Sequence, residues 1–478
     1  MTHFIRYSAR AVVLAIALGS LVLAQQLGTT QPSADDTLDT HPFVPFDRFM
    51  ANTATTAFQS AATSKVANAA VLTEMRQHIM NLYQGVHVTH SFEQDSQTVD
   101  CVPIEQQASV RMLGLPGIAA PPPNLLPSTP AAGAATVLGQ SGEVTPASLR
   151  PASAVDRFGN ATSCEDGTVP IQRTTLEQIS RFPTLKAFLS KSPDGKAHIP
   201  GQQTSAQVLP HAALAVDLRH RHNTVYQSVY NLGGSSNLNL WNPYVYTPTG
   251  AAFSLSQVWY AGFQPDGVTV QTVEAGWHVF PDLYGTNKLL PHLFVYFTAD
   301  GYKTSGCYDK SCPGFVQTSG NVFVGQAFPT YSQYQGSQVE VQIMWEFWAG
   351  NWWLNVNGEW VGYYPGSLFG SGQMATHATS VEYGGEVTVY NYGGIFPPMG
   401  SGRYGDTGWQ SAAFQRNIQY FDTGLVLRYP SLVRNTNECP AATAAPPIGQ
   451  TGTSVLGPDS WAAPWGIYFF FGGPAFYC

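Results

Sequence analysis

Short segments with strand-like alternation, separated by turn residues, fill the chain from about residue 205 to its end. Across 339–346, Val339, Val341, Ile343 and Trp345 alternate with polar residues, which is the pattern of a half-buried β-strand. Asn357-Gly358 lies between two aromatic runs and is a strong signal for a two-residue hairpin. No long helical period interrupts these segments, so we predict an all-β domain, an antiparallel β-sandwich of two stacked, curved sheets. Further strands are expected at Phe253–Tyr260, Val268–Thr272, Leu293–Thr298 and Glu386–Tyr390.

Composition agrees with a large β-rich core and argues against nucleic acid as a partner. The 478 residues are 44% hydrophobic and 13% aromatic, whereas only 11% are charged. The chain has 46 glycines and 34 prolines, which indicate many turns. The formal net charge is −8 and there is no basic block, so the electrostatic footprint of a nucleic-acid-binding protein is missing from the sequence.

Residues 1–24 are typical of a secretory signal peptide. Arg6 and Arg10 form a positive start, and Ala11–Ala24 is an apolar stretch too short to span a membrane comfortably. Small residues at its end suit cleavage before Gln25, and an uncleaved anchor is the alternative. We therefore expect a secreted protein, extracellular or periplasmic, with no membrane attachment once the signal is removed.

A different kind of region, residues 25–204, precedes the strand-rich part at 205–478. Residues 66–83 are predicted to form a helix with an apolar stripe of Leu72, Met75, Ile79 and Leu82. Residues 115–154 are dense in proline, alanine, glycine and serine, and are interpreted as a linker or loop. We expect a small, mixed and partly helical region ahead of the sandwich.

Six cysteines are compatible with disulfides in an exported protein. Six cysteines allow about fifteen pairings, so the connectivity cannot be deduced rigorously. Sequence order suggests Cys101–Cys164, Cys307–Cys312 and Cys439–Cys478.

Two glutamates stand out among small and aromatic neighbours. Glu274 lies in Val-Glu-Ala-Gly-Trp and Glu386 in Gly-Gly-Glu-Val, both in segments expected to be strands. A carboxylate in such surroundings must find partners or change its pKa. Two carboxyl groups brought together can work as an acid/base pair that hydrolyses a peptide or glycosidic bond. The alternative is that both are carboxylates at the rim of a sheet.

Several motifs follow one another closely across 205–478. The motifs are Phe253-Ser-Leu-Ser-Gln257-Val-Trp259, Val273-Glu274-Ala-Gly-Trp277-His-Val-Phe-Pro281, Leu283-Tyr-Gly285, Phe297-Thr-Ala-Asp300-Gly-Tyr302, Thr304-Ser-Gly-Cys307-Tyr, Cys312-Pro-Gly-Phe-Val-Gln317, Gly350-Asn-Trp-Trp-Leu354, Val361-Gly-Tyr-Tyr-Pro365, Tyr383-Gly-Gly-Glu386-Val387 and Met399-Gly-Ser-Gly402. In their order and density they resemble the neprosin family of secreted glutamic (prolyl) endopeptidases. A shorter match, Asp100-Cys-Val with Gln107 after it, resembles the activation-peptide region of the family.

The resemblance implies a catalytic cleft across one sheet of a β-sandwich and a two-glutamate mechanism that activates water. It implies cleavage after proline, activity favoured in acid, and synthesis as a zymogen. By motif, Glu274 and Glu386 are the catalytic pair. Residues 25–204 would be the pro-region, an intramolecular inhibitor of the domain at 205–478, and peptides or proteins would be the substrate.

Four further residues are candidates for the cleft. Gln257 can donate to a developing oxyanion, and Trp259 and Trp277 can line the cleft, although each has an ordinary role in the core or the strand ladder as its alternative. Tyr383 stands where tryptophan is expected before Gly-Gly-Glu, so it is expected to alter the subsite for the residue before the scissile bond.

No cofactor or metal is predicted. His220 and His222 lie on one face of an expected strand, but no third ligand is evident from the sequence. The chain lacks a Gly-x-Ser-x-Gly elbow, a His-Glu-x-x-His helix and a phosphate loop, which argues against serine, metallo- and nucleotide-dependent enzymes. An aromatic-rich carbohydrate-binding sandwich and a two-glutamate glycoside hydrolase are the alternative functions.

Overall fold

The structure is a computed structural model. It describes residues 43–58, 65–123, 135–137, 140–142, 144–149, 153–191, 200, 218–245, 252–285, 290–390, 395–436 and 465–477. The predicted signal peptide at 1–24, and the predicted Cys439–Cys478 pair, lie outside the described residues. Phe43–Cys478 forms one compact unit of the chain.

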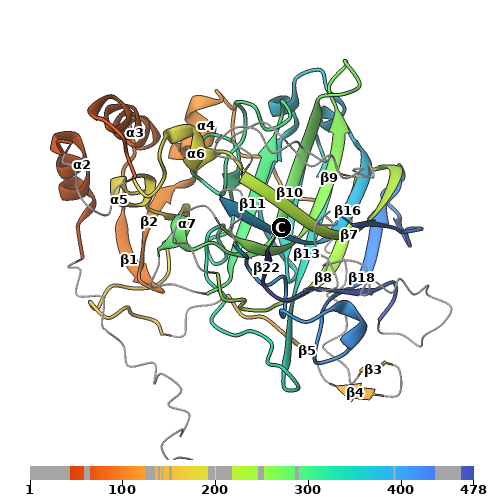
Figure 1. The fold of residues 1–478 in the computed structure, drawn as a ribbon. Helices are drawn as coiled ribbons and strands as arrows, with labels where there is room; N and C mark the ends of the chain where they lie inside the picture. Colours follow the sequence, from red (N-terminus) through yellow and green to blue (C-terminus); the bar gives the residue numbers. More distant parts are fainter. Residues whose placement is uncertain are drawn as a thin grey trace, which may run out of the picture. The chain divides into compact units, whose positions relative to one another are not determined.

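One sheet of the sandwich has six strands in the order β11-β10-β9-β16-β7-β20, and every neighbouring pair is antiparallel. Figure 1 shows the strands of this sheet. Successive residues of a strand point to opposite faces, and those of one face, such as Val258 and Val273, lie in the main core. The strands are β7 (Leu218–Asn231), β9 (Ser254–Phe263), β10 (Val270–Val279), β11 (His292–Thr298), β16 (Ala378–Tyr390) and β20 (Val433–Thr436).

The second sheet has nine strands, with a main path β12-β15-β14-β13-β8-β18-β19. The predicted hairpin is present: β14 and β15 are joined by Asn357 and Gly358, which both have positive φ angles, as such a tight turn requires. The strands are β5 (Val144–Pro146), β8 (Gly233–Asn239), β12 (Val316–Gln317), β13 (Gln338–Trp348), β14 (Asn351–Val356), β15 (Glu359–Pro365), β18 (Ala413–Phe421), β19 (Leu427–Arg428) and β21 (Phe469–Phe471).

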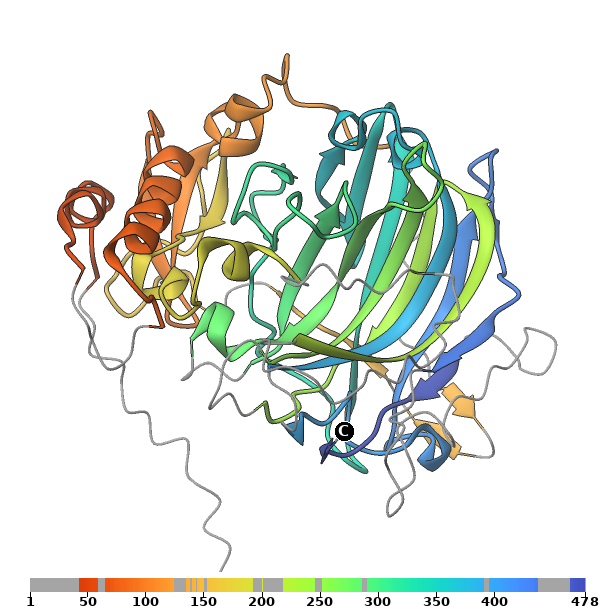
Figure 2. The same ribbon diagram turned by 45° about the horizontal axis from the view of Figure 1, so that its top comes forward.

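The main hydrophobic core lies between these two sheets. The face of β13 that carries Val341, Ile343 and Trp345 packs in one cluster with Val258 and Val273 from the six-stranded sheet. Figure 2 shows that the long strands of the sandwich are curved. The predicted all-β sandwich of two stacked sheets is therefore confirmed.

The N-terminal region, by which we mean the described residues from 43 to 191, is mixed and contains a small antiparallel sheet, β1-β2-β6. The predicted helix is present as α3 (Ala69–Leu82), capped by the side chain of Asn68, with the expected stripe buried. The other elements are α2 (Phe46–Thr55), β1 (His90–Gln94), β2 (Gln97–Pro103), η1 (Ile104–Gln106), α4 (Ala108–Met112), β6 (Thr168–Gln172), α5 (Leu176–Ile179) and α6 (Leu185–Leu189).

The N-terminal region packs against the face of the six-stranded sheet that points away from the main core. A second apolar cluster joins Met75 and Ile79 of α3 and Phe188 of α6 to Leu255 and Trp259 of β9. Figure 2 shows these elements, coloured red to yellow, beside the sandwich. Burial of large side chains on both sides makes this a contact between folded parts rather than a tail lying on a surface.

The segment predicted as a linker contains more structure than its composition suggests. β5, at Val144–Pro146, pairs in parallel with Gln338–Glu340 of β13, so the segment adds a short strand to the nine-stranded sheet. The remaining short elements are β3 (Ala135–Val137), β4 (Gln140–Gly142), α7 (Pro281–Tyr284), η2 (Gly366–Phe369), η3 (Gln373–Ala375), β17 (Ile395–Phe396), η4 (Gly405–Thr407) and β22 (Phe476–Tyr477).

Two disulfides are formed among the described residues. Cys101–Cys164 links β2 to the loop before β6, and Cys307–Cys312 closes a short loop after β11. Both pairings match those suggested by sequence order. Within the described part of the chain, no helix is long and apolar enough to cross a membrane.

Candidate active site

The two glutamates project from the same face of the six-stranded sheet, on either side of β9. Glu274 of β10 is in register with Trp259 of β9, and Glu386 of β16 is in register with Leu255 of the same strand. Residues two apart share a face of a strand, so Gln257 lies on this face between those two register positions. Antiparallel pairing through β9 therefore brings together carboxylates that are 112 positions apart in sequence (386 − 274).

Glu274 is fully buried and held by hydroxyl donors. The Tyr302 hydroxyl donates to its Oε1 at 2.5 Å, and the Thr272 hydroxyl donates to the same atom at 2.9 Å. Tyr302 follows Gly301 in the loop after β11 and has a positive φ of 63°, an uncommon conformation for a bulky residue. Burial and the neighbouring charge of Glu274 raise the pKa of Tyr302 well above its ordinary value, so this phenol remains a donor.

Glu386 is also buried, but its partners carry charge. Its Oε2 accepts from Gln257 Nε2 at 3.1 Å and from Lys191 Nζ at 2.8 Å. Its Oε1 bonds to His220 Nδ1 and lies 3.4 Å from His222 Nε2. Burial alone would raise the pKa of Glu386, but the positive charges of Lys191 and His222 and hydrogen bonds with both histidines hold this pKa well below its ordinary value.

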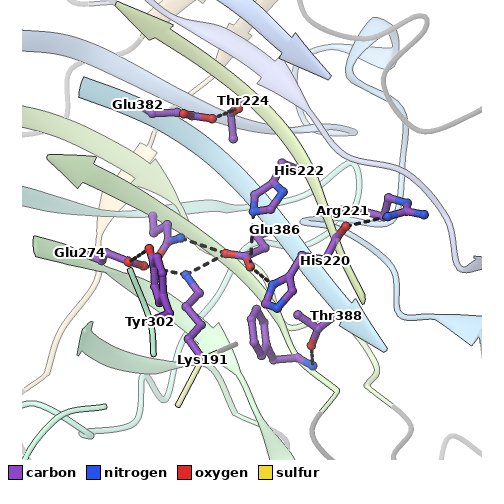
Figure 3. Close-up of polar contacts among 12 residues, drawn as sticks. Lys191, His220, Arg221, His222, Thr224, Glu274, Tyr302, Glu382, Glu386 and Thr388 are labelled. Carbon is purple, nitrogen blue, oxygen red and sulfur yellow. Dashed lines mark hydrogen bonds and ion pairs between the residues drawn. The ribbon is translucent and has the colours of Figure 1, made fainter. Parts of the chain in front are cut away.

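A lysine of the N-terminal region joins the two carboxylates (Figure 3). Lys191 follows α6, and its Nζ lies 2.7 Å from Glu274 Oε2 and 2.8 Å from Glu386 Oε2. Its backbone N–H donates to the Tyr296 hydroxyl at 3.2 Å, and its ammonium group lies 5.3 Å from the centre of the Trp259 ring. Burial alone would lower the pKa of Lys191, but attraction to both glutamates raises it, so the lysine bridges the pair as a cation.

Glycine at two positions beside Gln257 is required by the close approach of strands. A Cβ at Gly276 would lie 2.0 Å from the carbonyl oxygen of Ser256, and Gly384 has a φ of 146° with the carbonyl oxygen of Asn223 only 2.4 Å from a Cβ placed there. These contacts explain the glycines beside both glutamates in the sequence motifs. They also leave Gln257 flanked by residues without side chains.

Two of the four candidate cleft residues are on the wrong face. Trp277 and Tyr383 are fully buried in the core between the two sheets, because each is an odd number of residues from its glutamate along the strand. Trp277 Nε1 donates to the carbonyl of Asn239 at 3.0 Å, and the Tyr383 hydroxyl donates to the carbonyl of Gln419 at 3.2 Å. The prediction that Tyr383 lines a subsite is therefore wrong, whereas Gln257 and Trp259 do lie on the face of the glutamates.

Several residues of the site were not predicted as functional. Lys191 is remote in sequence and carries no motif, so only the fold could find it. Tyr302 is the last residue of the motif Phe297-Thr-Ala-Asp300-Gly-Tyr302, and its hydroxyl group was the feature that could have marked it as a functional residue. Glu382, four residues before Glu386 on the same face, is a third buried carboxylate, and it accepts a hydrogen bond from Thr224. Its even spacing along β16 was the signal for a shared face.

In the structure, the two histidines have Glu386 beside them as a possible third metal ligand, which was not evident from the sequence. His220 and His222 are two apart on β7, and His222 is directly paired with Glu386 of β16. One nitrogen of each ring and one carboxylate oxygen of Glu386 all lie within 4.8 Å of one another. The rings themselves are nearly parallel, at 9°, with centroids 6.1 Å apart.

Comparison with known proteins finds a similar solved structure and a matching family model. A solved structure of scytalido-glutamic peptidase with a transition state analog inhibitor is similar over 55% of this chain and 100% of its own, with 10% sequence identity and a TM-score of 0.27. Residues 250–474, which include Glu274, Glu386 and Gln257, match the family model for Neprosin. Over these residues the chain is therefore similar to the neprosin family.

Proposed function

We propose that the protein is a secreted glutamic endopeptidase, made as a zymogen, in which Glu274 and Glu386 hydrolyse peptide bonds. The Neprosin domain supports a peptidase of the glutamic type. The observation that carries the proposal for these two residues is that both carboxylates are buried on one sheet face and are bridged by a single ammonium group. Buried and paired carboxylates, of which one, Glu386, has a strongly lowered pKa, are typical of acid/base sites.

The surroundings of the two carboxylates give them different parts. Once Lys191 is withdrawn, Glu386 still has His220 and His222 beside it, whereas Glu274 is left with the neutral hydroxyls of Tyr302 and Thr272. The group with cationic neighbours retains its charge better. Glu386 is therefore the base and Glu274 the proton-bearing acid.

Hydrolysis then proceeds in two balanced steps. Glu386 takes a proton from water, and the oxygen of that water forms a bond to the carbonyl carbon while Glu274 gives its proton to the carbonyl oxygen. Gln257 Nε2, now bonded to Glu386, is placed to donate to the same oxygen. When the tetrahedral species collapses, the C–N bond breaks, the amine nitrogen takes the proton held by Glu386, and one hydroxyl of the gem-diol returns its proton to Glu274. Both carboxyl groups finish with the protonation they had at the start.

The N-terminal region is proposed to hold the enzyme inactive. Lys191 occupies the position that the catalytic water and the scissile carbonyl need, between the two carboxylates. Because the pKa of Glu386 is depressed while Lys191 is bound, this contact is strongest above the carboxyl's ordinary pKa and is lost as the pH falls through the depressed value. Acid therefore favours withdrawal of residues 25–204 from the catalytic domain at 205–478.

Cleavage after proline is proposed from the family resemblance, with support from the aromatic lining of the site. Phe253 and Trp259 both face the Lys191 ammonium group, at 6.0 and 5.3 Å from their ring centres. A flat apolar surface beside the reacting carbonyl suits a proline ring. Secretion is compatible with the two disulfides.

The experiment is digestion of a peptide library by acid-treated full-length protein, with mass spectrometry identifying the residue before each cut. We expect cuts after proline in wild type and none in Glu274→Gln or Glu386→Gln. Glu346→Gln, which changes a carboxyl on the other sheet, is the control. Cuts at random positions would remove the proline assignment, and undiminished cutting by either glutamate variant would remove the mechanism. A protein that cuts no peptide but binds or cleaves sugars would favour the carbohydrate-directed alternatives.

A further inference from the structure

The proposed peptidase chemistry does not require two histidines beside one of the carboxylates, yet His220 and His222 lie next to Glu386. Two imidazoles and one carboxylate, with one donor atom from each lying within 4.8 Å of the others, are the three protein ligands of an open zinc site. Two imidazole nitrogens and one carboxylate oxygen suit Zn²⁺, Cu²⁺ and Ni²⁺, whereas Ca²⁺ and Mg²⁺ prefer oxygen ligands only. The cluster therefore points to a transition-metal ion.

The backbone fixes all three ligands before any ion arrives. His220 and His222 project from one face of β7, and His222 is paired in register with Glu386 on the adjacent β16. β16 lies between β9 and β7, and β7 also pairs with β20 through Asn223–Tyr226, directly after His222. Little ordering is needed on binding, so the ligand set is preorganised.

The two oxygens of Glu386 are divided between two sets of partners. Oε2 accepts from Gln257 and Lys191, which leaves Oε1 directed at His220 and His222. An ion at Oε1 would replace the present contact between Oε1 and His220 Nδ1. The donation from Gln257 to Oε2 would persist and would fix the orientation of the ligating carboxylate, as outer partners do in known metal sites.

We propose that His220, His222 and Glu386 form a binding site for Zn²⁺ that is weakened while Lys191 is in place and strengthened when Lys191 leaves. The Lys191 ammonium is bonded to the same carboxylate that the ion would use, so two cations compete for one anionic group. Metal binding itself does not depend on the proposed peptidase activity. Its consequence does: an ion on Glu386 removes the base, so Zn²⁺ inhibits the active enzyme, and a chelator restores activity.

Co²⁺ is the probe, because its visible absorption reports tetrahedral coordination directly. Full-length wild type, Lys191→Met and the double variants Lys191→Met/His220→Asn and Lys191→Met/His222→Asn are titrated at neutral pH. Lys191→Met/His377→Asn is the matched control, since His377 is stacked on Tyr230 elsewhere on the sheet. Circular dichroism establishes that each variant is folded.

We expect Lys191→Met to bind one Co²⁺ with tetrahedral bands that Zn²⁺ abolishes, and wild type to bind it at least about tenfold more weakly. The bands should be lost in the His220 and His222 variants and kept in the His377 control. Folded Lys191→Met that binds no Co²⁺ or Zn²⁺, or bands that survive loss of His222, would overturn the proposal. Since absorbance needs no turnover, an inactive protein that still binds the ion would refute the peptidase and leave the metal site standing.

Discussion

Lys191 and Lys310 are both buried lysines that connect the N-terminal region with the sandwich, yet their surroundings are opposite. Lys191 comes from the N-terminal region and lies between two carboxylates, which raise its pKa. Lys310 comes from the sandwich and donates to three neutral acceptors: Gln107 Oε1 at 2.9 Å, Ser109 Oγ at 3.2 Å and the carbonyl oxygen of Phe315. Burial lowers the pKa of Lys310 to about 7.

The comparison shows how one contact surface can use charge in two ways that respond to pH over different ranges. At Lys191 the sensitive partner is Glu386, whose depressed pKa means that stabilisation is lost as the pH falls through it. At Lys310 the lysine itself is sensitive. Its pKa in the folded protein is below the ordinary 10.5, so burial destabilises the fold fully below pH 7, and the penalty is relieved as the pH rises toward 10.5.

The largest effect is expected on catalysis, and it tests whether Glu386, which binds Lys191, is a catalytic residue or only a structural partner of the lysine. If Glu386 is the base, Glu386→Gln should lower kcat of the acid-activated enzyme by about 10²–10⁴-fold, since that is the usual contribution of a general base. Initial rates on a proline-containing peptide measure it. Activity within about twofold of wild type would make Glu386 a structural acceptor, as Gln107 is for Lys310.

The next prediction concerns stability at the bridged site. Lys191→Met leaves two buried carboxylates without their shared cation, so the free energy of unfolding at pH 7 should fall by about 3–5 kcal/mol. The loss should shrink toward pH 4, where the carboxylates can take up protons instead. Urea unfolding at the two pH values tests this, and an equal loss at both would contradict the assigned role of the carboxylates.

At Lys310, replacement of the lysine by methionine should raise the free energy of unfolding rather than lower it. Lys310→Met removes a costly buried amine, while Gln107 Oε1 still accepts from the Gln317 N–H and the Phe315 carbonyl still accepts from the Ser109 hydroxyl. The variant should be more stable than wild type at pH 6, by up to a few kcal/mol, and the gain should vanish near pH 10. A destabilised Lys310→Met at pH 6 would mean that the hydrogen bonds outweigh burial.

The smallest effect is expected at an exposed pair on the same contact surface. Lys65 Nζ lies 3.2 Å from Asp282 Oδ2, but the lysine side chain is 35% exposed. Such pairs contribute about 0–1 kcal/mol, so Lys65→Met should change the unfolding free energy by no more than that. A larger change, or one that persists at high salt, would show that position on this surface matters more than burial.

Periodicity predicted most of the fold because it reports which face of a strand is buried. The hairpin at Asn357-Gly358, the core face of β13 and the apolar stripe of α3 all follow from spacing within a few residues. The same dependence on strand position explains which site predictions were wrong. Trp277 and Tyr383 belong to the same motifs as Glu274 and Glu386, yet an odd offset from these glutamates directs them into the core.

The rest of the site depends on contacts between distant parts of the chain. Gln257 and Trp259, predicted only as possible cleft residues, lie on the face of the glutamates because they share their parity on β9 with the register positions of both. Lys191 could not be predicted, since its role arises only where the N-terminal region packs against the sheet. His220 and His222 were visible as a pair, but their neighbour Glu386 depends on the pairing of β7 with β16.

The central claim is that Lys191 keeps the Glu274–Glu386 pair inactive until acid releases it. The most direct test is the pH at which full-length protein first cleaves a fluorogenic proline peptide, compared between wild type and Lys191→Met, with Lys65→Met as control. Without the ammonium bridge, the onset of activity should move to a higher pH than in wild type, while Lys65→Met should start with wild type. An unchanged onset in Lys191→Met, with activity still dependent on Glu386, would contradict the claim.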